Sequence, residues 1–149
     1  MGEEDTAELM KKLRELLGAQ KVGVLATEYE GQPYASLVAF AATPDLGSLL
    51  FATERSTRKF MNMSVNPKAT LLVDNRTEGL SDVNSALAAA AMGKTEEVRG
   101  KDWGELSKTY LAKNPDFSGF LESAALMRLR VDNYIVVHGL REITVVEVP

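Results

Sequence analysis

Hydrophobic and polar positions follow a helical period in the first twenty residues. The four leucines from Leu9 to Leu17 lie at i, i+4, i+7 and i+8, which places them on one face of a helix. Asp5 and Glu8 have the spacing of a capping box, and Gly18 stands where a C-cap glycine is expected. The apolar face needs a surface to cover, so we expect this helix to pack across the opening of a sheet.

After Gly18 the pattern becomes that of strands joined by short turns. Glu30-Gly31 and Pro44–Gly47 are turn signals, and short connections favour antiparallel pairing over βαβ units. The chain is predicted to end in a hairpin around Gly139. Outside one ambiguous stretch, the predicted strands are residues 21–27, 33–42, 48–53, 69–74, 124–137 and 141–148.

Two further helices are predicted between these strands. Ser56 or Thr57 is a suitable N-cap for a helix that ends at Asn66-Pro67, because the residue before a proline is disfavoured in the α region. A second amphipathic helix is predicted over residues 103–113 and ends at Asn114-Pro115.

The run from Ala86 to Met92 is ambiguous on its own. Alanine propensity favours a helix, whereas Gly93 and the continuation to Val98 suit a long strand. With or without it, six or seven strands and a few short helices predict a small β-barrel in a single domain, residues 1–149.

Composition narrows the classes of function. Seventeen basic and 21 acidic residues give a net charge of -4, which argues against nucleic-acid binding. The absence of cysteine excludes disulfides and thiolate sites, and a single histidine, His138, excludes a site with two imidazoles from one chain. Apolar runs of about seven residues are too short to cross a bilayer. The acidic N-terminus lacks an apolar signal segment, so we expect a cytoplasmic protein without membrane contact.

The segment FATERSTRKFMNM, residues 51–63, carries the strongest chemical signal. Two hydroxyls and three cations gather at the predicted helix start: Ser56, Thr57, Arg55, Arg58 and Lys59. Cations at a helix N-terminus oppose the macrodipole, and a bound anion would reverse this repulsion. The pattern therefore suits a phosphate site, although a solvated basic turn would have the same sequence.

Residues 22–74 resemble the flavin-binding split-barrel family related to pyridoxamine 5′-phosphate oxidase. The resemblance combines a strand with GQPY, a strand ending in F-x-T, an STRK helix start with an N-x-x-x-NP exit, and a following strand. The weaker C-terminal part, PDFSGFLE to NYIVVHGLREITVV, is similar to the closing hairpin of a branch with haem-utilisation relatives. The resemblance implies a mainly β fold with peripheral helices, a six- to seven-stranded antiparallel split β-barrel of the FMN-binding type. It also makes Ala88–Ala91 a strand near the flavin and the dimer axis.

The same resemblance implies FMN at the interface of a homodimer. Thr57, Arg58 and Lys59 would hold the FMN phosphate. Strand residues would run past the isoalloxazine with backbone groups at its pyrimidine edge; these are Ser36, Leu37, Val38 and Ala39. Phe51 and Ala52 would line the site from the next strand. The strand over residues 36–39 would also suit an ordinary core.

Departures from the family limit the expected chemistry. The chain ends GLREITVVEVP without the basic segment with which the true oxidase grips its substrate, so pyridoxamine phosphate oxidation is not expected. His138 lies on an apolar strand and is interpreted as structural, although a lone axial histidine can hold haem. No catalytic residue and no metal ligand is assigned. The expected function is an FMN-dependent oxidoreductase of an unidentified small molecule. The alternatives are a flavin electron carrier or sensor, a haem or tetrapyrrole binder, and a deazaflavin-dependent reductase.

Overall fold

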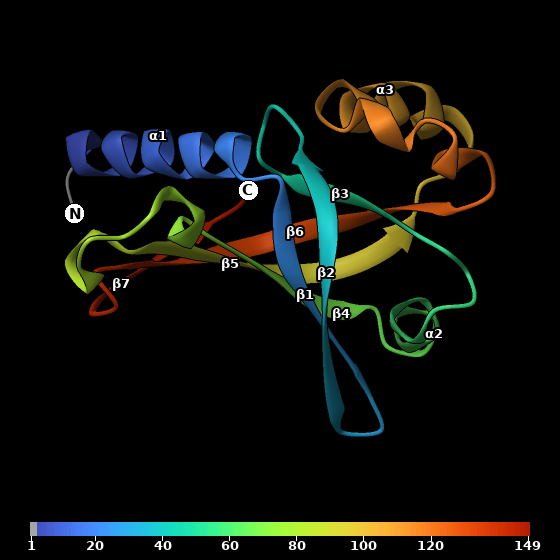
Figure 1. Cartoon of the computed structure of the whole chain (residues 1–149), viewed down its shortest axis with the longest axis horizontal. Coiled ribbons are helices and arrows are strands. Elements are labelled where there is room, and N and C mark those ends of the chain that lie inside the picture. Colours follow the sequence, from blue (N-terminus) through green and yellow to red (C-terminus); the bar gives the residue numbers. More distant parts are fainter. Residues whose placement is uncertain (1–2) are drawn as a thin grey trace.

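Seven strands form one antiparallel sheet in the computed structural model, which describes residues 3–149 (Figure 1). The strand order is β3-β2-β1-β4-β5-β6-β7, and β3 also pairs with β6, so the first six strands in this order close a barrel. Strand β7 extends the sheet beyond the closure. The strands are β1 (Val22–Tyr29), β2 (Gln32–Ala42), β3 (Ser48–Thr53), β4 (Lys68–Asp74), β5 (Leu87–Glu97), β6 (Ala125–His138) and β7 (Glu142–Glu147). The predicted antiparallel split barrel is confirmed.

Within residues 3–149, one α-helix precedes the first strand, and two α-helices and five short 3-10 helices lie between later strands. The α-helices are α1 (Glu3–Ala19), α2 (Arg58–Val65) and α3 (Trp103–Lys113). The 3-10 helices are η1 (Arg76–Glu78), η2 (Val83–Ser85), η3 (Gly100–Asp102), η4 (Pro115–Phe117) and η5 (Phe120–Glu122). Of the helices described, none is both long and apolar enough to span a membrane.

Helix α1 lies across one end of the barrel, as its apolar face predicted (Figure 1). Leu13, Leu16 and Leu17 are buried in the main core. The predicted ends of the helix were wrong, because Asp5 and Gly18 both lie inside it. A helical glycine costs about 1 kcal/mol. Burial of Leu16 and Leu17 on the same turn offsets that cost, so the helix continues past the glycine.

Strand β5 settles the ambiguous alanine run in favour of a strand. It pairs with β4 on one side and with β6 on the other, and these contacts override the helical propensity of alanine. The ladder to β6 is interrupted by a bulge between Met92 and Gly93. A Cβ atom on Gly93 would lie 1.8 Å from the Arg130 carbonyl oxygen, so only glycine fits this close approach.

Helix α3 covers a second, smaller core outside the barrel. Leu106 and Tyr110 pack there with residues of β2, β3 and β6. The Tyr110 hydroxyl donates to the Ala39 carbonyl oxygen at 3.2 Å, and burial raises the pKa of Tyr110 to about 12. Helix α3 is thereby fixed against the middle of β2.

Candidate functional site

Thr57 caps the N-terminus of α2, as the sequence predicted. Its Oγ1 accepts from the Phe60 backbone N–H at 3.3 Å and donates to the Glu54 carbonyl oxygen at 2.9 Å. The same oxygen lies 2.9 Å from Thr53 Oγ1 at the end of β3. These contacts occupy the Thr57 hydroxyl, so its part in an anion site is to place the start of the helix.

Two of the three cations near this helix start are free to meet an anion. The Arg58 guanidinium lies over the Tyr34 ring, 5.7 Å from its centroid, and forms no ion pair among the described residues. Lys59 forms no ion pair within residues 3–149. Arg55 is engaged elsewhere, because it pairs with Glu97 at 2.7 Å and donates to the Ser123 carbonyl oxygen.

Two asparagines four residues apart hold α2 against β1. Asn62 is almost fully buried, and its Nδ2 donates to Thr27 Oγ1 at 3.0 Å. Asn66 donates to the Glu28 carboxylate one residue further along β1. The sequence pattern predicted only a helix exit for these asparagines. Their i, i+4 spacing on one helix face was the signal for this anchoring role.

One edge of β2 has no strand partner over most of its length. Strand β1 pairs with β2 from Gln32 to Ala39, but β3 pairs only with Phe40–Ala42. The Phe40 N–H donates to the Lys21 carbonyl oxygen on the β1 side. Backbone groups alternate along a strand, so those of Leu37 face the opposite, open edge. Within the described chain this edge offers a hydrogen-bond donor and acceptor beside α2.

The predicted β2 residues divide between the two faces of the sheet. Ser36 and Val38 point into the barrel, since Ser36 pairs with the buried Leu25. The Ser36 hydroxyl is buried and has no hydrogen-bond partner in the described structure. Leu37 points outward and is 67% exposed, and Ala39 lies on the same outer face. Only backbone groups and the outer side chains of this stretch can reach a ligand outside the barrel.

The two predicted residues of β3 are covered. The Phe51 side chain is fully buried in the main core, and Ala52 packs against the smaller core under α3. Neither side chain faces the open edge of β2. Their part in a site on that edge is limited to the backbone and to supporting the turn that leads into α2.

A row of apolar residues crosses the outer face of the sheet through six strands. The strand registers place these residues directly opposite one another: Leu37, Val24, Leu72, Ala90, Ile135 and Val145. Leu37, Leu72 and Val145 are exposed. A continuous apolar row on an uncovered sheet face is typical of an interaction surface.

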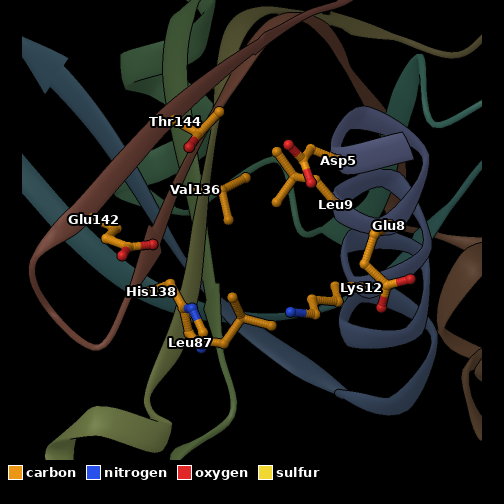
Figure 2. Close-up of a pocket in the computed structure, with 9 residues that line it drawn as sticks. All are labelled: Asp5, Glu8, Leu9, Lys12, Leu87, Val136, His138, Glu142 and Thr144. Atoms are coloured by element: carbon orange, nitrogen blue, oxygen red, sulfur yellow. The ribbon is translucent and has the colours of Figure 1, made fainter. Parts of the chain in front are cut away.

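His138 lines a pocket under the N-terminal half of α1 (Figure 2), and the β6–β7 hairpin that carries it lies at the opposite side of the molecule from α2 (Figure 1). Figure 2 shows His138 and Glu142 of the β6–β7 hairpin across the cavity from Asp5 and Glu8 of α1. The cavity measures about 230 Å³, and of the described residues that line it Lys12 alone carries an amine. Three carboxylates around a single exposed imidazole make this pocket predominantly negative. The described residues contain no group of three or more side chains placed to hold a metal ion.

The protein has the architecture of a split barrel. Six antiparallel strands close a barrel that is open where β2 leaves β3, and α2 is inserted between β3 and β4. The chain belongs to the pyridoxamine 5′-phosphate oxidase family, whose sequence profile matches residues 9–137. The resemblance stated from the sequence is confirmed. The comparison with curated proteins found none that matches this sequence.

Several solved structures share the fold at low identity. A haem-binding protein from Mycobacterium smegmatis is 20% identical with a TM-score of 0.80, over 90% of this chain and 55% of its own. Campylobacter jejuni ChuZ is 17% identical with a TM-score of 0.78, over 95% of this chain and 60% of its own. A FAD-binding protein from Mesorhizobium loti is 18% identical with a TM-score of 0.70, over 85% of this chain and 90% of its own. This chain therefore spans little more than half of the first protein, and these likenesses show the fold.

Proposed function

We propose that this protein binds FMN, with the phosphate at the N-terminus of α2 and the isoalloxazine along the open edge of β2. The observation that carries the proposal is the pairing of two unneutralised cations, Arg58 and Lys59, with an unpartnered backbone edge next to them. The first backbone N–H groups of α2 have no acceptor within the helix, and its dipole favours an anion there.

The residues present fit the group. The Arg58 fork and the Lys59 amine would bind the phosphate with charge-assisted hydrogen bonds. The backbone N–H and C=O of Leu37 match a heterocycle edge that carries both acceptors and donors. The buried, unpartnered Ser36 hydroxyl faces the barrel interior and takes no part in this edge. A bound flavin supplies hydride or electron transfer, and the protein binds and orients it. We therefore infer an oxidoreductase of a small molecule, with donors on β2 favouring negative charge on the reduced ring.

We also infer a homodimer formed through the outer apolar row. An exposed apolar surface of this kind can pair with the same surface of a second copy about a two-fold axis. Light scattering should then give twice the 16.3 kDa chain mass. Leu37→Glu places a charge in the apolar row and should prevent dimerisation. The variant should still fold, because Leu37 is 67% exposed in the single chain. The control Val65→Glu changes an equally exposed residue of α2 outside the row and should leave the dimer intact. A monomeric wild-type protein that binds FMN would contradict the interface.

Haem is a second ligand to test, since a structural neighbour is a haem-binding protein. The surroundings of His138 support it poorly. A cavity of about 230 Å³ is small for a tetrapyrrole, and the haem propionates would meet the carboxylates of Asp5, Glu8 and Glu142. If haem binds through this imidazole, His138→Ala should abolish its absorption band. A deazaflavin would use the same phosphate site as FMN, so mass spectrometry of extracted cofactor separates the two.

The first experiment is a visible absorption spectrum of the purified protein, repeated after FMN is added and free ligand is removed. Retained flavin bands support the proposal, and reduction by NAD(P)H then tests for an oxidoreductase against a carrier or sensor. A protein that refuses FMN refutes the phosphate assignment of Arg58 and Lys59 and leaves the fold unaffected.

A further inference from the structure

A second cationic site lies at the junction of α1, α3 and the turn between β2 and β3, away from α2 (Figure 1). The Lys113 side chain, on the last turn of α3, is half-buried there. Its Nζ donates to the Leu17 carbonyl oxygen near the end of α1 at 2.8 Å. The same nitrogen lies 3.8 Å from the centroid of the Phe40 ring. Both partners are neutral, and no carboxylate pairs with this ammonium among the described residues.

A pocket of about 350 Å³ opens beside Lys113. Most of its lining is small or apolar, with Leu17, Ala42 and Leu46 among the residues on its walls. Among the described residues, its charged lining residues are Arg14 of α1 and Lys113, and none of them is an Asp or a Glu. An apolar cavity with two cations and no anion complements a ligand that has an anionic head and an apolar body.

The charged and titratable groups around the pocket do not neutralise Lys113. Arg14 adds a like charge from α1, with Nη1 donating to the Pro44 carbonyl oxygen at 2.6 Å. Asp45, on the turn, is held by Thr43 Oγ1 and by the Gly47 N–H, and these hydrogen bonds lower the pKa of Asp45. The Tyr110 hydroxyl of α3 is engaged with β2.

Burial of the Lys113 ammonium lowers the pKa of Lys113 to about 8, because burial disfavours the charged form. A desolvated cation without a counter-ion gains from any anion that enters the cavity. A bound carboxylate would supply the missing charge, and burial of its apolar tail would add to the affinity.

We propose that this pocket binds a small monocarboxylate with an apolar tail, the carboxylate between Arg14 and Lys113 and the tail along Leu17, Ala42 and Leu46. The proposal is independent of the flavin site, since these residues lie neither at the start of α2 nor on the stretch of β2 that lacks a partner strand. If the Lys113 ammonium served only to cap α1 and to contact Phe40, the cavity would not prefer a carboxylate over a neutral ligand of the same length.

Octanoate is the probe, measured by calorimetric titration at pH 7, with octanol as the neutral ligand of matched length. Octanoate should bind, and octanol should bind at least tenfold more weakly. Lys113→Met keeps an unbranched side chain beside Phe40 but removes the charge, and it should lower octanoate affinity at least tenfold. Arg14→Gln should lower the affinity as well. The control Lys108→Met changes an exposed lysine of the same helix that does not line the cavity and should leave the affinity unchanged.

The wild-type protein gives a test that needs no variant. If octanoate binds only the charged amine, its apparent affinity falls by the factor 1 + 10^(pH − pKa), so a pKa of about 8 predicts roughly 30-fold weaker binding at pH 9.5 than at pH 7. The octanoate charge does not change over this range. Equal binding of octanoate and octanol, a pH-independent affinity, or no binding at all would each overturn the proposal.

Discussion

Replacing both Arg58 and Lys59 with alanine tests the phosphate site most directly. The structure separates the effect on FMN affinity from the effect on folding. The Arg58 guanidinium lies over the exposed ring of Tyr34, and neither Arg58 nor Lys59 forms an ion pair among the described residues. Neither side chain holds the barrel together, so the double variant should fold as the wild type does.

The expected magnitudes follow from these contacts. A hydrogen bond to a charged group contributes about 1.5–3 kcal/mol. With a discount for solvent exposure at the helix start, two such contacts give about 2–5 kcal/mol, or about 30- to 4,000-fold in Kd. For folding, losing the cation–π contact costs about 0.5–1 kcal/mol. Removing two cations from a helix N-terminus returns about 0.3–1 kcal/mol each. The net change in the free energy of unfolding should stay within about 1.5 kcal/mol.

The assay is a titration of FMN fluorescence quenching at fixed ionic strength, with thermal unfolding measured on the same samples. Lys101→Ala/Lys108→Ala is the matched control, because it removes two exposed positive charges at sites outside α2. It should keep wild-type FMN affinity. An unchanged Kd in the α2 double variant, or an equal loss in the control, would refute the reasoning.

Three further changes test the fold around the two sites. Asn62→Ala removes a buried hydrogen bond and should lower the free energy of unfolding by about 2–3 kcal/mol in urea, whereas Ser64→Ala, exposed on the same helix, should change it by less than about 0.5 kcal/mol. Gly93→Ala forces a Cβ onto a carbonyl oxygen and should lower the free energy of unfolding by about 3 kcal/mol or more. Gly104→Ala has open space around it in α3 and should raise the free energy of unfolding by about 0.5–1 kcal/mol. A small loss for Gly93→Ala would contradict the close approach. The folded-state pKa of Lys113 lies below its unfolded value, so its burial penalty is present below pH 8 and is relieved as the pH rises. Wild-type stability should therefore rise relative to Lys113→Met between pH 7 and 9.5, and parallel pH profiles would exclude the shift.

Local signals in the sequence were sufficient to predict the structure of the segment that forms the candidate phosphate site. An N-cap at Thr57 and a proline exit at Asn66-Pro67 depend on neighbouring residues alone, and the helix observed lies between them. The short turns likewise fixed the antiparallel order of the first strands. Strand β5 differed, because its residues favour a helix and only its pairing with β4 and β6 makes it a strand.

The cationic pocket could not be predicted in this way. Lys113 and Leu17 are 96 positions apart, and they meet only because α1 and α3 both lie beside β2. Nothing near residue 113 in the sequence distinguishes this lysine from an exposed one on a helix. Its burial and its missing counter-ion follow from the packing of the two helices. The same holds for Ser36: the sequence predicts that it lies on a strand, but not that its hydroxyl is buried without a hydrogen-bond partner.

The turn between β1 and β2 determines which residues of β2 reach each environment. Glu30 and Gly31 both have positive φ, at 50° and 83°, which is the backbone of a two-residue type I′ hairpin turn. That turn sets the register in which Val24 opposes Leu37. Side chains alternate along a strand, so a shift of one residue would bury Leu37 and expose Val38. It would also exchange the backbone groups that face the open edge with those that pair to β1. The core, the apolar row and the proposed flavin edge therefore depend on the same turn, and selection for one of them constrains the other two.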